Sequence, residues 1–196
     1  MNYVINLNRR SDRLKIFSNL ANNADVDFEL MEAVDGKLLD RKQFWTTKFG
    51  DRYLKRGELG VYLSHYKIYE ETKEPMVIIF EDDARIPLDF YYQLRCALEK
   101  LPPDWDIVLL GVSNLWRRKY QAKQKVIYDD GFFQKFQGDI YGLHSYMINK
   151  RGMDRLIDCK FPIDSPIDVK INNVGLQVYV VKEDIVTTNK LGSDTQ

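Results

Sequence analysis

Apolar runs that are typical of buried strands alternate along this chain with segments in which apolar residues recur at helical spacing. Unbroken apolar runs suit strands that are covered on both faces, and recurrence every three or four positions suits a helix with one buried face. The predicted strands are Tyr3–Leu7, Phe28–Val34, Met76–Phe80, Asp106–Gly111, Phe132–Phe136, His144–Asn149 and Leu176–Val181, and the predicted helices lie at 11–21, 57–71, 90–101 and 150–158. Strands that alternate with helices predict a three-layer α/β/α domain with a mostly parallel central sheet.

Two basic segments interrupt this alternation. Residues 37–56 are irregular, with a single helical turn near Phe44, and residues 112–131, which contain W-R-R-K-Y-Q-A-K-Q-K, suit a mobile loop. Ser11 is the candidate N-cap of the first helix. Because the chain shows no internal repeat and no linker, we expect one domain over residues 1–196.

The composition narrows the class of protein. Of the 196 residues, 44% are hydrophobic and 13% aromatic, which predicts one soluble globular domain with a substantial core. Lys plus Arg and Asp plus Glu both number 29, so no net field attracts nucleic acid or an anionic membrane. No segment resembles a signal peptide or a membrane span of about 20 apolar residues, so we expect a cytoplasmic protein. Cys96 and Cys159 are too few for a disulfide framework or a cysteine metal site.

Three acidic residues, Glu81, Asp82 and Asp83, directly follow the predicted strand Met76–Phe80. In an open α/β sheet, ligands bind beyond the carboxyl ends of the strands. Side chains alternate along an extended chain, so we expect Glu81 and Asp83 to point to one side and Asp82 to the other. Two carboxylates on one side supply part of the oxygen shell of a hard divalent cation, which would also offset their repulsion. The simpler interpretation is an ordinary acidic strand end that is solvated or pairs with Arg85.

Short sequence blocks on both sides of this acidic cluster follow one another in a distinctive order. They are V-I-N-L-N-R-R-S-D-R-L at 4–14, A-V-D-G at 33–36, G-E-L-G-V-Y-L-S-H at 57–65, F-E-D-D at 80–83, H-S-Y-M-I-N-K-R-G-M-D-R-L at 144–156, P-I-D-V-K-I at 166–171 and S-D-T-Q at 193–196. In order and approximate spacing they resemble glycosyltransferase family 25 over essentially the whole chain. Val61 stands where that family often has a cysteine, and the region 37–56 and the C-terminus are short. The resemblance implies a GT-A-type fold, a UDP-galactose or UDP-glucose donor, inversion at the anomeric carbon, and a Mn²⁺ or Mg²⁺ cofactor.

The resemblance also implies roles for particular residues. The donor pocket would be lined by Asn6, Arg9, Arg13, Asp35, Glu58, His65 and Asp82, and the cation would be held by Glu81, Asp83 and His144. An arginine can bind diphosphate oxygens through two hydrogen bonds, and imidazole combined with carboxylates suits Mn²⁺. Structural alternatives stay open: a solvated helix face for Arg13, a plain turn for Asp35, a helix N-terminus for Glu58, and buried hydrogen-bonded rings for His65 and His144.

Two aspartates in F-P-I-D-S-P-I-D-V-K-I are candidates for the catalytic base. An inverting transfer needs a carboxylate that accepts the proton of the acceptor hydroxyl. Asp168 is the first choice, because the G-L-Q-V-Y that follows it arrives at the usual interval of the family, and Asp164 is the second. The structural alternative is a helix start, since Asp164 or Ser165 before Pro166 suits an N-cap.

These expectations combine into a hexosyltransferase that uses a UDP-sugar and a glycan or hydroxylysine acceptor. Its nucleotide-binding half would lie at about 1–111 and its acceptor side at about 112–196, with the basic stretch 116–125 as a candidate to close over the diphosphate. Two other hypotheses are a metal-dependent phosphohydrolase that uses the same acidic cluster and a degenerate member that binds nucleotide or glycan without catalysis. The ordered N-terminal blocks argue against the first, and the intact acidic cluster argues against the second. We expect contact with a membrane only through the acceptor.

Overall fold

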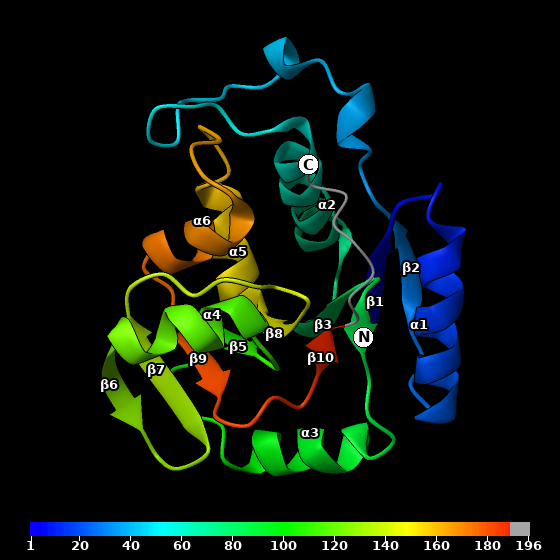
Figure 1. The fold of residues 1–196 in the computed structure, drawn as a ribbon, viewed down its shortest axis with the longest axis vertical. Coiled ribbons are helices and arrows are strands. Elements are labelled where there is room, and N and C mark those ends of the chain that lie inside the picture. The colour runs from blue at the N-terminus through cyan, green and yellow to red at the C-terminus, as the bar shows by residue number, and fades with distance from the viewer. Residues whose placement is uncertain (189–196) are drawn as a thin grey trace.

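The computed structural model describes residues 1–188, and in this region of the chain eight strands form one sheet (Figure 1). The strands are β1 (Asn2–Asn6), β2 (Glu29–Glu32), β3 (Met76–Glu81), β5 (Ile107–Leu109), β6 (Lys125–Asp129), β7 (Phe133–Gln137), β8 (Ser145–Asn149) and β9 (Val178–Val181), in the spatial order β2-β1-β3-β8-β5-β9-β7-β6. The pairings β1–β2, β1–β3 and β5–β9 are parallel, whereas β8 and β7 run against their neighbours. The predicted mostly parallel sheet is therefore confirmed, with two antiparallel strands inserted into it.

Helices cover both faces of the sheet. They are α1 (Ser11–Asn23), α2 (Arg56–Glu71), α3 (Phe90–Glu99), α4 (Asn114–Lys119), α5 (Lys150–Asp158) and α6 (Ile167–Asn173), with 3-10 turns η1 (Gly36–Leu38), η2 (Arg41–Gln43) and η3 (Gln121–Lys123). On one face, α2, α5 and α6 enclose a core that contains Tyr66, and on the other, α1 and α3 bring Phe17 and Phe90 against the strands. The neighbouring residues Ile79 and Phe80 of β3 enter opposite cores, as strand alternation requires. Within residues 1–188, none of the helices combines the length and apolar character needed to cross a bilayer.

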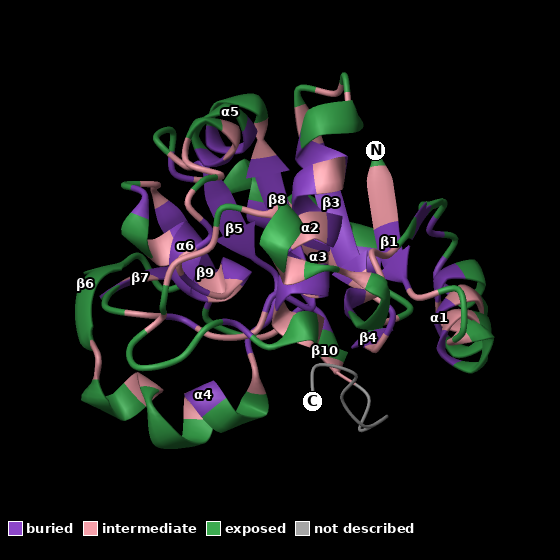
Figure 2. Cartoon of the chain, turned by 90° about the horizontal axis from the view of Figure 1, so that it is seen from above, coloured by how far each residue is buried: buried purple, intermediate pink, exposed green. Residues whose placement is uncertain are grey.

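The segment 112–131 forms secondary structure, which corrects the mobile loop predicted for it. It contains α4, η3 and β6, and β6 is an exposed edge strand on the rim of a sheet whose central strands are buried (Figure 2). Trp116 of α4 is completely buried, and its Nε1–H donates to the carbonyl oxygen of Asp139 at 2.9 Å. Arg117 forms an ion pair with Asp184. Buried Trp116 thus holds this basic segment against the sheet, where it packs on Phe136 of β7.

Several local details also depart from the sequence-based outline. Ser11 is the first residue of α1, with Arg10 in the N-cap position, so the predicted Ser11 cap is wrong. Pro166, and not Asp164, occupies the N-cap position of α6. A short antiparallel pair, β4 (Ala84–Arg85) with β10 (Thr187–Thr188), follows the acidic cluster and had no clear sequence signal. The S-D-T-Q block at 193–196 lies outside the described residues.

Candidate functional site

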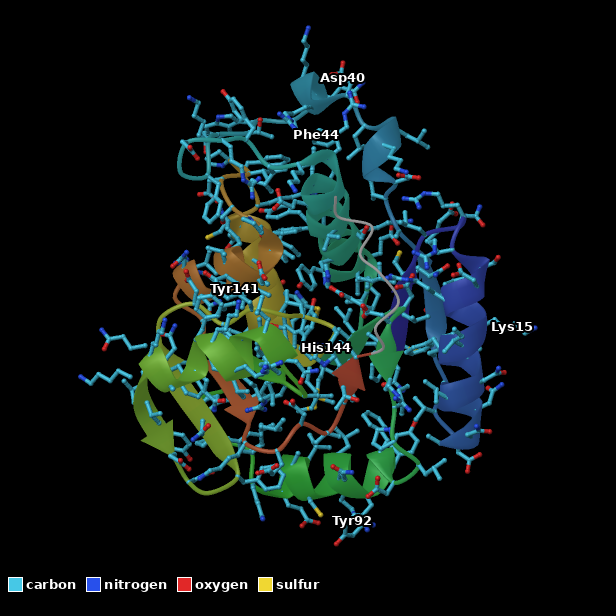
Figure 3. The ribbon with its side chains drawn as sticks, viewed as in Figure 1. Lys15, Asp40, Phe44, Tyr92, Tyr141 and His144 are labelled. Carbon is cyan, nitrogen blue, oxygen red and sulfur yellow. The ribbon has the colours of Figure 1, made fainter. Side chains whose placement is uncertain are left out.

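The acidic cluster lies at the carboxyl end of β3, beside the end of β1. The two strands are parallel, and Ile5 of β1 is in register with Glu81 of β3. The backbone N–H of Glu81 donates to the carbonyl oxygen of His144, just before β8, at 2.9 Å. Asp82 and Asp83 then form the turn that leads into β4. Parallel strands β1 and β3 and the antiparallel neighbour β8 therefore bring three distant sequence blocks to one edge of the sheet, with His144 at the centre of the molecule (Figure 3).

Asp82 connects this edge to helix α1. Arg13 donates from an Nη atom to Asp82 Oδ1 at 2.6 Å, and Asn6 donates from Nδ2 to Asp82 Oδ2 at 2.8 Å. The side chains of Arg13 and Asp82 are each only 8% exposed. Burial raises the pKa of Asp82, and the positive charge of Arg13 opposes that rise. Three of the predicted donor-pocket residues are thus brought together, in a buried ion pair that fixes α1 against β1 and β3.

Glu81 and Asp83 are shifted in opposite directions by their surroundings. Glu81 faces His65 of α2, whose Nε2 lies 3.8 Å from Glu81 Oε1. Burial acts to raise the pKa of Glu81, but the neighbouring His65, with smaller contributions from His144 and Arg13, brings it below its usual value. Burial and the charge of Glu81 raise the pKa of Asp83 to about 7. The two carboxyls therefore share one electrostatic environment, in which Glu81 holds its negative charge more readily.

The residues at this edge fit a divalent cation. Asp83 Oδ1 is buried and has no hydrogen-bond partner among the described residues, so a cation beside Glu81 would satisfy that oxygen and offset the repulsion. Within residues 1–188, no three His, Cys, Asp or Glu side chains are placed as a complete metal site, so the other ligands would be oxygens of water or of a bound phosphate. His144 Nε2 contacts the carbonyl oxygen of Val186 at 2.9 Å, which leaves Nδ1 as the ring atom for a ligand bond. The assignment of Glu81, Asp83 and His144 as ligands stays a prediction.

Two other predicted donor-pocket residues stabilise local structure. Asp35 accepts hydrogen bonds from Arg9 Nε at 3.0 Å and from the backbone N–H of Lys37 at 3.0 Å, and the Arg9 bond is the main reason that its pKa is lowered. Glu58 pairs with Arg52 through two bonds of 2.7 and 2.8 Å and closes a capping box at the start of α2. Asp35 therefore stabilises a turn and Glu58 a helix N-terminus, as the structural alternatives for them predict. Arg9 and Asp35 lie together at the ends of β1 and β2.

The A-V-D-G block and the G-E-L-G-V-Y-L-S-H block contact each other directly. A Cβ atom added to Gly36 would lie 1.9 Å from the carbonyl oxygen of Arg56, so the backbones of η1 and α2 meet without space for a side chain. Gly60 is similarly close to Val34, where an added Cβ would be 2.6 Å from the carbonyl oxygen. Ser64 Oγ accepts from the Val34 backbone N–H at 2.8 Å. These blocks thus set the position of α2, and with it that of His65, relative to β2.

Asp168 and Asp164 have different environments. Asp168 lies in the first turn of α6, where burial, with a contribution from the charge of Glu81, raises its pKa to about 6. Its Oδ1 accepts from the backbone N–H of Val169 at 3.0 Å. Asp164 instead pairs at 3.0 Å with Lys170 Nζ, and the Lys170 side chain is only 8% exposed. Asp168 is therefore the aspartate that is electrostatically linked to the acidic edge, whereas Asp164 neutralises a buried lysine.

Two tyrosines that contact the site were missed by the sequence-based reasoning. His65 Nδ1 lies 2.7 Å from the hydroxyl oxygen of Tyr146 in β8, and that oxygen lies 2.5 Å from the hydroxyl of Tyr69 in α2. Tyr69 belongs to an apolar helical stripe and Tyr146 to an apolar strand, where tyrosines are ordinarily core residues, so neither pattern marks the pair. The available signal was spacing, since His65 and Tyr69 are one helical turn apart and Tyr146 follows His144 by two residues.

Comparison with known proteins places this chain in a family. The sequence model of glycosyltransferase family 25 (LPS biosynthesis protein) matches residues 1–171. Procollagen galactosyltransferase 1-A of Xenopus laevis is 29% identical over 90% of this chain and 32% of its own length. The human inactive glycosyltransferase 25 family member 3 is 30% identical over 61% of this chain and 23% of its own length. The chain thus spans about a third or less of these curated relatives.

A solved structure agrees with the fold. The galactosyltransferase LgtC, solved with donor and acceptor sugar analogues, superimposes with a TM-score of 0.50 at 13% sequence identity. The match covers 92% of this chain and 73% of LgtC. The mixed α/β architecture of the GT-A type expected from the sequence is confirmed.

Proposed function

The chain belongs to glycosyltransferase family 25, and we propose that it transfers a hexose, galactose or glucose, from a UDP-sugar to a hydroxyl group of a glycan or of hydroxylysine. We further propose that the transfer inverts the anomeric carbon and depends on Mn²⁺ or Mg²⁺. The Xenopus relative is a procollagen galactosyltransferase, which makes galactose the first sugar to test. The observation that carries the proposal is that burial, with a contribution from the charge of Glu81 at the acidic edge, gives Asp168 a pKa of about 6 that suits a base near neutral pH.

In this proposal the donor lies over the carboxyl ends of β1 and β3, within residues 1–111. Glu81 and Asp83 would hold the cation, and Asn6, Arg9, Arg13, Asp35, Glu58 and His65 would hold or support the nucleotide side of the site. When bound, the cation would supply positive charge that stabilises the diphosphate of the departing UDP. Arg13 also forms the buried pair with Asp82, which fixes α1 against the turn after β3.

Asp168 would act as the catalytic base from the acceptor side, 112–196. Its carboxylate accepts the proton of the acceptor hydroxyl while the hydroxyl oxygen forms the new bond to the anomeric carbon. The bond between that carbon and the phosphate oxygen of UDP breaks at the same time, and UDP leaves with the bonding electron pair. At pH 7 a carboxyl with a pKa of about 6 is mostly ionised and still basic enough to accept this proton. Asp164 is the weaker candidate, because Lys170 already neutralises it.

One assay tests the proposal against its rivals. The protein is incubated with UDP-galactose, UDP-glucose and other UDP-sugars in Mn²⁺, with and without glycan or hydroxylysine-peptide acceptors, and UDP, phosphate and transferred sugar are measured. Acceptor-dependent release of UDP with sugar on the acceptor is the expected result, and Asp168→Asn should abolish it while Asp164→Asn retains some of it. Acceptor-independent release of phosphate would instead identify a phosphohydrolase.

A non-catalytic binding protein is the second candidate, and one observation favours it. The human relative with 30% identity is an inactive family member. The intact Glu81–Asp83 pair and the raised pKa of Asp168 point the other way, because a protein that only binds has no need of a base. Binding of UDP with Mn²⁺ in calorimetry, without turnover on any acceptor, would establish this second candidate.

A further inference from the structure

A chain of three buried side chains runs from the core to the acidic edge. The hydroxyl of Tyr69 contacts that of Tyr146 at 2.5 Å, and Tyr146 contacts His65 Nδ1 at 2.7 Å. His65 then turns its other nitrogen, Nε2, toward Glu81 Oε1 at 3.8 Å. Tyr146 is 0%, His65 1% and Tyr69 3% exposed, so solvent does not compete for these contacts. These three side chains link the core between α2 and β8 to a carboxylate of the proposed site.

The number of donors and acceptors determines where each proton lies in this series of hydrogen bonds. A tyrosine hydroxyl ordinarily loses its proton only at about pH 10, so Tyr69 and Tyr146 each have one proton to donate at pH 8. Tyr69 has no other hydrogen-bond partner among the described residues, so its proton is donated to the Tyr146 oxygen. Tyr146 must then donate its single proton to His65 Nδ1, which leaves the ring proton of neutral His65 on Nε2.

The opposite arrangement of protons leaves two buried groups without suitable hydrogen-bond partners. If His65 Nδ1 carried the proton, Tyr146 would donate to Tyr69, and the Tyr69 proton would have no acceptor within residues 1–188. The bare lone pair of Nε2 would also face the Glu81 carboxylate, and no other hydrogen-bond partner lies near Nε2 in the described region of the chain. A buried donor without an acceptor has lost its hydrogen bond to water and gained none in the protein, so the first arrangement of protons is favoured.

We propose that Tyr69 and Tyr146 are positioning residues that hold His65 as its Nε2–H tautomer and direct that N–H at the Glu81 carboxylate. An adjustment of about 1 Å by the partly exposed Glu81 side chain turns the contact into a hydrogen bond. His65 therefore acts on the donor site through Glu81, because its own ring is sealed from the site by burial. The consequence for catalysis rests on the proposed function, whereas the tautomer itself does not.

The tautomer can be measured directly in the unmodified protein. The chain has only two histidines, so ¹⁵N-histidine labelling gives a simple long-range ¹H–¹⁵N spectrum, in which loss of signals in His65→Gln assigns the His65 ring. At pH 8 without divalent cations, we expect His65 Nε2 to be protonated and Nδ1 to be a hydrogen-bonded acceptor. A proton on Nδ1, either alone or in an imidazolium ring, would overturn the proposal.

Matched tyrosine variants test whether these hydrogen bonds hold the His65 tautomer. Tyr146→Phe removes the donor to Nδ1, so the Nδ1 resonance should move toward that of a free, unbonded nitrogen. Tyr66→Phe is the control. Tyr66, in α2, is buried like Tyr146, but its hydroxyl has no hydrogen-bond partner within residues 1–188. An Nδ1 resonance that does not move in Tyr146→Phe, or that moves equally in Tyr66→Phe, would refute the assignment.

Calorimetry with UDP and Mn²⁺ extends the test to the site. His65→Gln should weaken binding about 10- to 100-fold, as loss of a group that orients a metal-binding carboxylate does, and Tyr146→Phe should weaken it in the same direction by less. Unchanged affinity in both variants would overturn the positioning role. If the unmodified protein binds neither UDP nor Mn²⁺, the proposed function fails, and the histidine spectrum still decides the tautomer.

Discussion

Replacing Asp83 with asparagine tests whether crowded carboxyls at the end of β3 destabilise the fold until a cation binds. The usual pKa of the group is 3.8, and in the folded protein burial and the charge of Glu81 raise it to about 7. Between these values the folded protein keeps a proton on Asp83 that the unfolded chain has released. The free energy of unfolding therefore falls as the pH rises through this interval, and the stabilisation is fully present only below about pH 4.

The size of this loss follows from the pKa. Each pH unit within the interval is worth about 1.4 kcal/mol, so the rise to about 7 corresponds to about 3 kcal/mol between pH 5 and pH 8. Some of the rise comes from Glu81, whose side chain is one third exposed and can turn away from Asp83. We therefore expect the unmodified protein to lose about 2 kcal/mol relative to Asp83→Asn over this range.

Urea denaturation at pH 5 and pH 8, with EDTA present, measures the effect. The free energy of unfolding of the unmodified protein should fall relative to that of Asp83→Asn at the higher pH. Glu81→Gln is the control, because removal of the Glu81 charge should reduce the pH dependence without abolishing it. Saturating Mn²⁺ should then stabilise the unmodified protein more than Asp83→Asn. Parallel pH curves for the unmodified protein and Asp83→Asn would refute the reasoning.

Three further predictions concern other regions of the molecule. For transfer, kcat/KM should rise about tenfold per pH unit below pH 6 and level off above it, because Asp168 must be ionised; a flat profile measured from pH 5 to 8 would exclude it as the base. Arg13→Ala should destabilise the fold by about 3–5 kcal/mol in urea denaturation, because it leaves Asp82 buried without its cation, and paired Arg13→Met and Asp82→Leu changes should cost less. Gly36→Ala should destabilise by about 3 kcal/mol, since its Cβ would overlap a carbonyl oxygen. Gly50→Ala, at a φ of 64° in open space, should cost only about 1 kcal/mol, and equal losses would contradict the packing argument.

The central strands, such as β3 and β5, could be predicted because a strand covered on both faces must be apolar throughout. Their spatial order could not, because it depends on contacts between segments far apart in the sequence. Tyr146 of β8 pairs with both Ile79 of β3 and Leu109 of β5, which makes β8 an antiparallel strand between two strands that run the other way. The prediction for the segment 112–131 was wrong for a related reason, since its composition is basic and one buried residue, Trp116, determines its position.

The acidic edge of the site could also be predicted, because three carboxylates at a strand end are a local signal. The partners of those carboxylates could not. Asp82 is held by Arg13, 69 residues away in the sequence, and by Asn6, 76 residues away. His65 looked like either a pocket residue or a core residue, and its hydrogen bond to Tyr146 across 81 positions is what separates these interpretations. Distance along the chain, and not weakness of the contacts, hid these roles.

The acidic residues near this edge are divided by their surroundings into different tasks. Asp82 has both carboxylate oxygens in hydrogen bonds, with Arg13 and Asn6, which suits it to hold α1 against the ends of β1 and β3. Glu81 has a lowered pKa and Asp83 has an oxygen without a partner among the described residues, which suits a pair that shares a cation. Asp168 alone combines a raised pKa of about 6 with a position on another element, α6. Groups whose environments push their pKa values apart are the usual sign of separated acid, base and ligand roles. The same division that supports the proposed cation site at the end of β3 therefore supports the proposed base on α6.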